Sequence, residues 1–229
     1  SIAGQKGTYV AFDKISPNAV NAVLATEDRN FYHEPGFSVT GMIRGGLTTV
    51  WYRIRGINAS AGGSTITQQL VKNAFLTQNQ TITRKIRELF LAIQVEKEYS
   101  KQDILAMYLN NAYFGQGVWG IQDASLKYFG VNASDLSVTQ GAMLAGMLQS
   151  PNGYDPLNYP KNALNRRNQV LQNLVNDKKL SQTEADQYAA TAIGATDHNV
   201  DNSNYNYPYF FDAVIDEAIN KYGLTESEI

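Results

Sequence analysis

The spacing of apolar residues predicts a mostly helical protein, because they recur at three- and four-residue intervals along most of the chain. The first run begins at Ser16-Pro17, a pair suited to a helix start, since Ser can cap free amide groups and Pro fits the first helical position. The helix is predicted to continue over 18–26. Its buried face is predicted to carry Val20, Val23 and Leu24.

Glu27 follows directly on this helix and falls on its apolar face, three residues after Leu24. Burial raises the pKa of a carboxyl group, and such a carboxylate can accept a proton near neutral pH. Glu27 is therefore a candidate general base. The alternative is a solvated Glu at a helix end, and the segment 25–36, ATEDRNFYHEPG, does not by itself separate the two.

Further helices are predicted over 82–99, 100–110, 136–148, from 166 onward, and over 181–192. Apolar residues surround the 82–99 segment almost completely, which predicts a buried central helix. Ser100 and Asp103 form a capping-box pattern, and the small residues of 136–148 predict close packing on a neighbour. Residues 8–12 are a short strand or an extended lead-in. No long alternating pattern, repeat or P-loop is present.

Residues 37–63 combine large apolar side chains, Gly and three arginines, at 44, 53 and 55. This mixture suits a surface that lies against lipid head groups, where aliphatic groups enter the boundary and Arg stays with phosphate. An ordinary amphipathic core helix is the alternative, and on this segment alone it is favoured.

Composition narrows the possible functions. The 229 residues form one large domain or two small ones, and the net charge of −2 argues against a general nucleic-acid binder. The chain has no Cys and two His, which excludes disulfides and Cys nucleophiles and disfavours a His-based metal site. No signal peptide or apolar run of about 18 residues occurs. We expect a domain taken from a longer protein.

Two segments supply cationic and polar groups. Residues 62–73, GGSTITQQLVKN, place two Gly and a candidate cap, Ser64, before a helix, which leaves amide groups for an anion. Gln68 and Lys72 are expected to share one face with Thr65, with the apolar residues on the other. Arg84 and Lys85 add two cations, beside Glu88, within the first turns of the next predicted helix.

Glu88 has two interpretations. It is either one partner of an intrahelical salt bridge at a solvated end or a buried carboxylate beside cations, and its apolar neighbours on both sides favour the second. Paired carboxylates suit sugar transfer, where one group activates an attacking hydroxyl. Clustered Arg and Lys suit a diphosphate.

Five ordered segments resemble the peptidoglycan glycosyltransferase domain of class A penicillin-binding proteins, glycosyltransferase family 51. They are EDRNFY from Glu27, GGSTITQQLVKN from Gly62, RKIRE from Arg84, KQDILAMYLNNAYFG from Lys101 and RRNQVL from Arg166. The resemblance covers about residues 10–174, and PYFFDAV from Pro208 resembles the bridge to a transpeptidase domain.

The resemblance implies a mostly α, lysozyme-like fold with a smaller membrane-facing lobe at about 37–63. It implies a glycosyltransferase domain over 1–195 and a connection over 196–229 toward a transpeptidase domain that is absent here. The expected reaction is polymerisation of lipid II onto a growing lipid-linked glycan strand at the outer face of the bacterial membrane, with release of polyprenyl diphosphate. An N-terminal segment outside this sequence would anchor the full-length protein.

Site residues follow from the same resemblance. Glu27 would be the general base that deprotonates the acceptor's 4-hydroxyl, and Glu88 would assist at the diphosphate, where a divalent cation, Mg²⁺ or Mn²⁺, is a candidate cofactor. Moenomycin-type inhibitors are expected to bind, and nucleic acid is not. The residues expected to bind substrate are Asp28, Ser64, Thr67, Gln68, Gln69, Lys72, Arg84, Lys85, Asn110 and Arg167.

The sequence departs from the family pattern after FY, where His33 comes first and Glu34-Pro35 follow, so His33 is given no role. The transpeptidase signatures SxxK and KTG are absent, and no penicillin binding is expected. A lysozyme or lytic transglycosylase is the nearest alternative, although a neutral glycan would not require the cations at 72, 84 and 85. A non-enzymatic membrane-docking module is the second.

Overall fold

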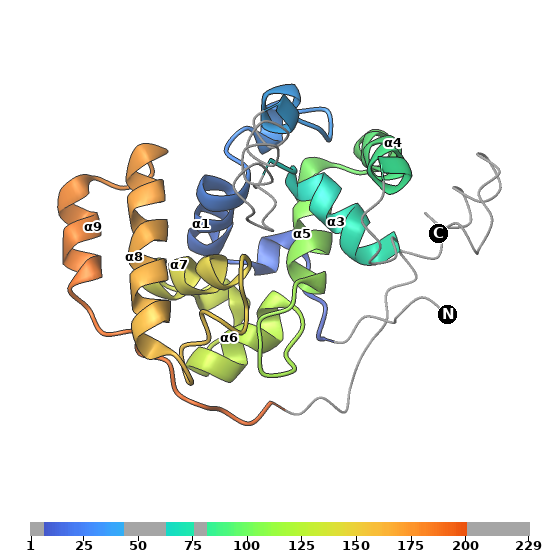
Figure 1. Cartoon of the computed structure of the whole chain (residues 1–229). Coiled ribbons are helices and arrows are strands. Elements are labelled where there is room, and N and C mark those ends of the chain that lie inside the picture. The colour runs from blue at the N-terminus through green and yellow to red at the C-terminus, as the bar shows by residue number, and fades with distance from the viewer. Residues whose placement is uncertain (1–6, 44–62, 76–81, 201–229) are drawn as a thin grey trace, which may run out of the picture. The chain divides into compact units, whose positions relative to one another are not determined.

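The computed structural model describes residues 7–43, 63–75 and 82–200, and this part of the chain is mostly helical, as predicted (Figure 1). Among these residues the structure has no strand, only an isolated bridge between Tyr113 and Trp119. The 3-10 turns are η1 (Phe12–Lys14), η2 (Phe31–His33) and η3 (Ala133–Asp135). The α-helices are α1 (Pro17–Glu27), α3 (Ile66–Phe75), α4 (Ile82–Glu98), α5 (Lys101–Asn111), α6 (Ile121–Phe129), α7 (Val138–Met147), α8 (Pro160–Asn176) and α9 (Gln182–Ala189).

The chain divides into two compact units. The first comprises residues 1–29 and 105–208, and the second comprises 30–104 and 209–229. Within the first unit, α1 packs against α7 and α8, α8 packs against α9, and α6 packs against α7 (Figure 1). Within the second, α3 packs against α4.

Helix α1 forms as predicted. The Ser16 hydroxyl accepts a hydrogen bond from the Asn18 amide (3.3 Å) and donates one to the Leu136 carbonyl (2.7 Å), so the cap also ties α1 to the segment before α7. Val20 and Val23 are buried, whereas Leu24 is half-buried. The buried face of α1 also includes Ala19, Ala22 and Ala25, so two of the three predicted residues lie on it.

Small residues let α7 approach its neighbours, which confirms the predicted close packing. A Cβ at Gly141 would lie 2.8 Å from the Ala19 Cα and amide nitrogen in α1. A Cβ at Gly146 would lie 2.9 Å from the Arg166 Cγ in α8. Since real Cβ atoms do not approach this closely, glycine at these positions sets the spacing of three helices.

Two predicted boundaries change in the C-terminal helices. Helix α8 begins at Pro160 rather than at Arg166, because Pro at the first helical position already starts it. Helix α9 has Ser181 as its N-cap, with Glu184 completing a capping box, and ends at Ala189, short of the predicted 192.

The prediction that 82–99 is a buried central helix is wrong. In α4, Ile86 is 64% exposed and Phe90 is 42% exposed. Leu91 and Val95 are buried, so α4 has one buried face and an apolar outer face in its N-terminal half. The nearly continuous apolar pattern of the sequence does not distinguish the buried face of α4 from its exposed apolar face. The Ser100–Asp103 capping pair, by contrast, is confirmed, since the Asp103 amide donates to the Ser100 hydroxyl (3.1 Å).

Several predicted features fall wholly or partly outside the described residues. Of the predicted membrane-facing stretch 37–63, the structure describes a helical turn over 39–43 and residue 63, and 44–62 lie outside. Residues 8–10 are an extended lead-in rather than a strand. None of the described helices is both long and apolar enough to span a membrane.

Residues 196–198, at the start of the predicted linker, dock on the end of α6. The Thr196 and His198 amides donate to the carbonyls of Tyr128 and Lys127, each at 3.0 Å. The Lys127 ammonium lies 2.5 Å from the Asp197 carboxylate. The linker is therefore ordered at its start, and residues 201–207 lie outside the described part.

Candidate functional site

Glu27 is the last residue of α1 and is half-buried. Asp28 follows as the C-cap, and its amide donates to the Leu24 carbonyl at 3.0 Å. Asp28 is 9% exposed. The helix therefore ends in two adjacent carboxylates, one accessible and one enclosed.

Tyr108 of α5 lies close enough to these carboxylates to feel their charge. Burial raises the pKa of the Tyr108 phenol well above its usual value, and the charges of Glu27 and Asp28 raise it further. The phenol is therefore neutral across the physiological range. It is a protonated hydroxyl in the neighbourhood of the candidate base.

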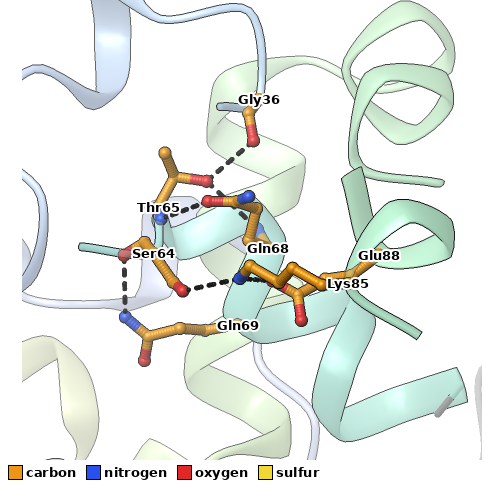
Figure 2. Close-up of polar contacts among 7 residues, drawn as sticks. All are labelled: Gly36, Ser64, Thr65, Gln68, Gln69, Lys85 and Glu88. Carbon is orange, nitrogen blue, oxygen red and sulfur yellow. Dashed lines mark hydrogen bonds and ion pairs between the residues drawn. The ribbon is translucent and has the colours of Figure 1, made fainter. Parts of the chain in front are cut away.

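Helix α3 is capped by Thr65 rather than by Ser64. The Gln68 amide donates to the Thr65 hydroxyl (3.1 Å), and the Gln68 side-chain carbonyl accepts from the Thr65 amide (2.9 Å), which makes a reciprocal capping box. The Thr65 hydroxyl also donates to the Gly36 carbonyl at 2.8 Å (Figure 2). The start of α3 is thus tied to the segment that follows Glu27 and Asp28 in the sequence.

This capping box explains why one prediction about α3 is wrong. Gln68 does not share an exposed face with Lys72: it is fully buried, while Lys72 is exposed. The buried Gln68 Nε2 has no hydrogen-bond partner among the described residues.

Lys85 lies between Ser64 and Glu88 (Figure 2). Its ammonium donates to the Ser64 hydroxyl at 3.1 Å and forms a hydrogen-bonded ion pair with the Glu88 carboxylate. The Glu88 side chain is 2% exposed and that of Lys85 is 46% exposed. The predicted salt bridge and the predicted burial of Glu88 are both present, so a buried carboxylate holds a cation that faces solvent.

The remaining predicted residues of this unit surround the same place. The Gln69 side-chain amide lies 3.5 Å from the Ser64 carbonyl (Figure 2). Arg84 precedes Lys85 on α4 and is half-buried. Thr67 is fully buried and donates to the Glu96 carboxylate at 2.5 Å. Thr67 therefore joins α3 to α4 and offers no surface to a ligand.

Asn110 and Arg167 occupy structural positions in the first unit. The Asn110 side chain accepts from the Val10 amide and donates to the Val10 and Ala106 carbonyls, at 2.7 to 2.8 Å. Arg167 is fully buried, and it donates to several carbonyl oxygens at the end of α9. Both side chains therefore have protein partners in the structure, and their contact with substrate stays a prediction.

Two residues with a part in this arrangement were missed. Glu96 of α4 and Lys101 of α5 form an ion pair at 2.7 Å that also reaches the segment after Asp28. Lys101 opens the segment KQDILAMYLNNAYFG, but no role was predicted for it, and no sequence pattern pointed to Glu96. A pattern based on helical spacing does not pair residues that lie in different helices.

The ligand set does not fit a metal held by the protein alone. Among the described residues, no group of three or more His, Asp or Glu side chains is placed to bind an ion. In the described part of the chain, Glu88 is the carboxylate that contacts Lys85, and it is already paired with that ammonium. Mg²⁺ and Mn²⁺ prefer several oxygen ligands, which this cluster does not supply.

Comparison with known families decides the assignment. The family model described as Transglycosylase matches residues 1–175. The chain belongs to this family. The matched region includes both the α1 carboxylates and the Lys85–Glu88 cluster.

Relatives with similar sequences are penicillin-binding proteins. The chain is 50% identical to penicillin-binding protein 2a of Streptococcus pneumoniae, over 100% of this chain and 31% of that protein. It is 38% identical to penicillin-binding protein 1A of Aquifex aeolicus, over 97% and 30%, and 36% identical to penicillin-binding protein 1A of Escherichia coli, over 96% and 25%. The chain thus spans about a third or less of each relative.

Proposed function

We propose that the chain polymerises lipid II into peptidoglycan glycan strands. Membership of the Transglycosylase family and the similarity to penicillin-binding proteins support this reaction class. The observation that carries the proposal is the solvent-facing ammonium of Lys85, fixed by Glu88 and Ser64. A fixed cation is what departure of a diphosphate requires and what a neutral glycan substrate does not.

Glu27 is the general base in this proposal. Its carboxylate takes the proton of the acceptor's 4-hydroxyl as that oxygen attacks the anomeric carbon of the growing chain. The bond to polyprenyl diphosphate breaks in the same displacement, so an α-linked donor gives a β-1,4 product without a covalent sugar–enzyme intermediate. The half-buried position of Glu27 at a helix end is compatible with this role.

Glu88 acts on the diphosphate through Lys85. A buried carboxylate orients the ammonium and limits its motion, so the cation is preorganised for the negative charge that develops on the leaving group. Arg84, Lys72 and Gln69 are proposed to bind phosphate or sugar groups nearby. Because Lys85 is accessible, a substrate can approach it without disrupting the Glu88 pair.

Three further expectations belong to the proposal. The reaction takes place at the outer face of a bacterial membrane, moenomycin-type inhibitors compete with substrate, and a divalent cation assists at the diphosphate. Because the described side chains do not supply a metal site, no step above is routed through a metal ion. Polymerisation with and without a chelator tests the third expectation, and competition assays test the second.

The deciding experiment gives the chain lipid II in one reaction and preformed glycan in another. The wild type is expected to polymerise lipid II and to leave the glycan intact. Glu27→Gln is expected to lower kcat by about 10²- to 10⁴-fold, the usual contribution of a general base. Asp13→Asn is the matched control, because Asp13 is an exposed carboxylate in the same unit.

Digestion of preformed glycan would instead favour a lytic enzyme. Undiminished polymerisation by Glu27→Gln would contradict the role of Glu27 as general base. An equal loss of kcat in Asp13→Asn would show that the effect is not specific to Glu27.

A further inference from the structure

The segment 30–36, which directly follows the α1 carboxylates, is held by the side chain of Lys101. The Lys101 ammonium donates to the Glu34 carbonyl at 2.6 Å. The same ammonium lies 4.4 Å from the centroid of the Phe31 ring, within the range of a cation–π interaction. One cation therefore contacts both the backbone and a buried aromatic side chain of this segment.

Glu96 fixes that cation in turn. The Lys101 ammonium lies 2.8 Å from Glu96 Oε1 and 2.7 Å from Oε2. The Thr67 hydroxyl of α3 donates to Glu96 Oε1 at 2.5 Å. The Lys101 side chain is 22% exposed and that of Glu96 is 9% exposed. The Lys101 ammonium thus donates to the Glu34 carbonyl and to Glu96 Oε1 and lies beside Oε2, so the group has little freedom to move.

Gly36 holds the other end of the segment. Its carbonyl accepts the Thr65 hydroxyl at 2.8 Å, and its φ of +86° is a conformation that favours glycine. A Cβ on Gly36 would lie 2.7 Å from the Glu96 Cγ and 2.8 Å from the Ala92 carbonyl oxygen. The backbone thus passes directly against α4 at the residue that pairs with Lys101.

We infer that Lys101 is a positioning residue, which with Glu96 holds segment 30–36 in register with the start of α3 and with the Lys85–Glu88 cluster. The inference rests on the proposed function. Lys101 transfers no proton and is not assigned a contact with substrate. Its proposed action is through the backbone, since one residue, Arg29, joins segment 30–36 to Asp28 and Glu27.

Accurate placement of the segment matters because a general base must lie within hydrogen-bond reach of the proton that it takes. A misplacement of about 1 Å can cost about 10²-fold in rate. A merely stabilising ion pair would behave differently: Lys101→Met would lower the free energy of unfolding, because Glu96 is left without its cation, but kcat well below Tm would stay unchanged. Measurements of kcat and of the local order of segment 30–36 therefore distinguish a positioning role from a merely stabilising ion pair.

The experiment uses the whole chain with Lys101→Met, Lys101→Arg and Lys127→Met. Lys127 is the matched control, because it forms an ion pair with Asp197 at 2.5 Å, is 17% exposed, and lies in the other unit. The first readout is hydrogen exchange of the amides of 30–36. The second is kcat and KM for polymerisation of lipid II.

Lys101→Met is expected to raise exchange in 30–36 about tenfold or more, since opening of the segment no longer breaks the hydrogen bond from Lys101 to the Glu34 carbonyl and the cation–π contact with Phe31. It is expected to lower kcat by about 10- to 100-fold with KM within about threefold of wild type. Lys101→Arg is expected to stay within about threefold in kcat, because guanidinium binds carboxylate and stacks on aromatic rings. Lys127→Met should change neither readout.

Unchanged exchange over 30–36 in Lys101→Met would overturn the inference, and so would raised exchange with unchanged kcat. If Lys101→Met does not fold, Glu96→Gln decides by the same two readouts, because it removes the negative charge and nearly preserves the volume. An inactive wild type would overturn the proposed function instead, and hydrogen exchange would still report whether Lys101 holds the segment.

Discussion

Arg167 lies inside the first unit with its guanidinium among carbonyl oxygens. Nη2 donates to the carbonyls of Tyr188 (3.2 Å), Ala189 (3.2 Å) and Thr191 (2.9 Å), and Nη1 donates to that of Ala192 (3.1 Å). Burial lowers the pKa of Arg167 from its usual value. Arg167 therefore joins α8 to the end of α9, and Arg167→Met is expected to reduce stability and leave substrate affinity unchanged.

The expected loss of stability in Arg167→Met depends on the carbonyl groups that water cannot easily reach once the guanidinium is removed. Tyr188 and Ala189 are half-buried, whereas Thr191 and Ala192 are exposed and can be hydrated when the guanidinium is removed. Two hydrogen bonds to a charged group contribute about 3–6 kcal/mol. Substitution also relieves the cost of burying the guanidinium, which leaves a net loss of about 2–4 kcal/mol. For a chain of this size, that lowers Tm by about 4–16 °C.

Thermal unfolding gives the first measurement, and KM for lipid II at a temperature well below Tm gives the second. Arg166→Met is the matched control, because the neighbouring Arg166 donates to the Gly146 carbonyl (3.2 Å) and lies over the Tyr154 ring. A smaller loss of Tm is expected there. Unchanged Tm in Arg167→Met, together with a tenfold higher KM, would refute this reasoning and support a substrate-binding role for Arg167.

Two other predictions concern the surroundings of α1. The free energy of unfolding should fall as pH rises above about 10, because an unfolded Tyr ionises there while folded Tyr108 keeps its proton. Tyr108→Phe should reduce that fall by up to about 1.4 kcal/mol per pH unit in urea titrations, and an unchanged slope would contradict the assignment. Gly141→Ala should lower stability by about 1–2 kcal/mol despite the higher helix propensity of Ala, since its Cβ would meet the α1 backbone. A stabilised variant in the same titration would show that α1 and α7 can separate at little cost.

Local signals in the sequence predicted α1 and α5 well. Ser16-Pro17 starts one helix and Ser100 with Asp103 starts the other, because capping depends on residues within a few positions of each other. The burial of Glu88 and its pairing with Lys85 were also predictable, since three residues in a helix bring two side chains together.

Contacts between segments that are distant in the sequence were not predictable in the same way. Thr65 replaces Ser64 as the cap of α3 because its hydroxyl also reaches Gly36, a contact between residues 29 apart in sequence. The partners of Arg167 lie 21 to 25 residues away, at the end of a helix whose position the sequence did not specify. Exposure of Ile86 depended on what covers α4, and apolar periodicity alone does not contain that information.

The docking of residues 196–198 on α6 determines where the chain can be shortened or fused. Thr196 and His198 satisfy the last carbonyls of α6, and the imidazole of His198 lies against Gly130, where a Cβ would come within 2.9 Å of the ring. Gly130 has φ +66° and ends the helix. A chain cut at residue 195 would expose these carbonyls and the Gly130 surface, whereas a cut or fusion after residue 200 would retain the intact end of α6.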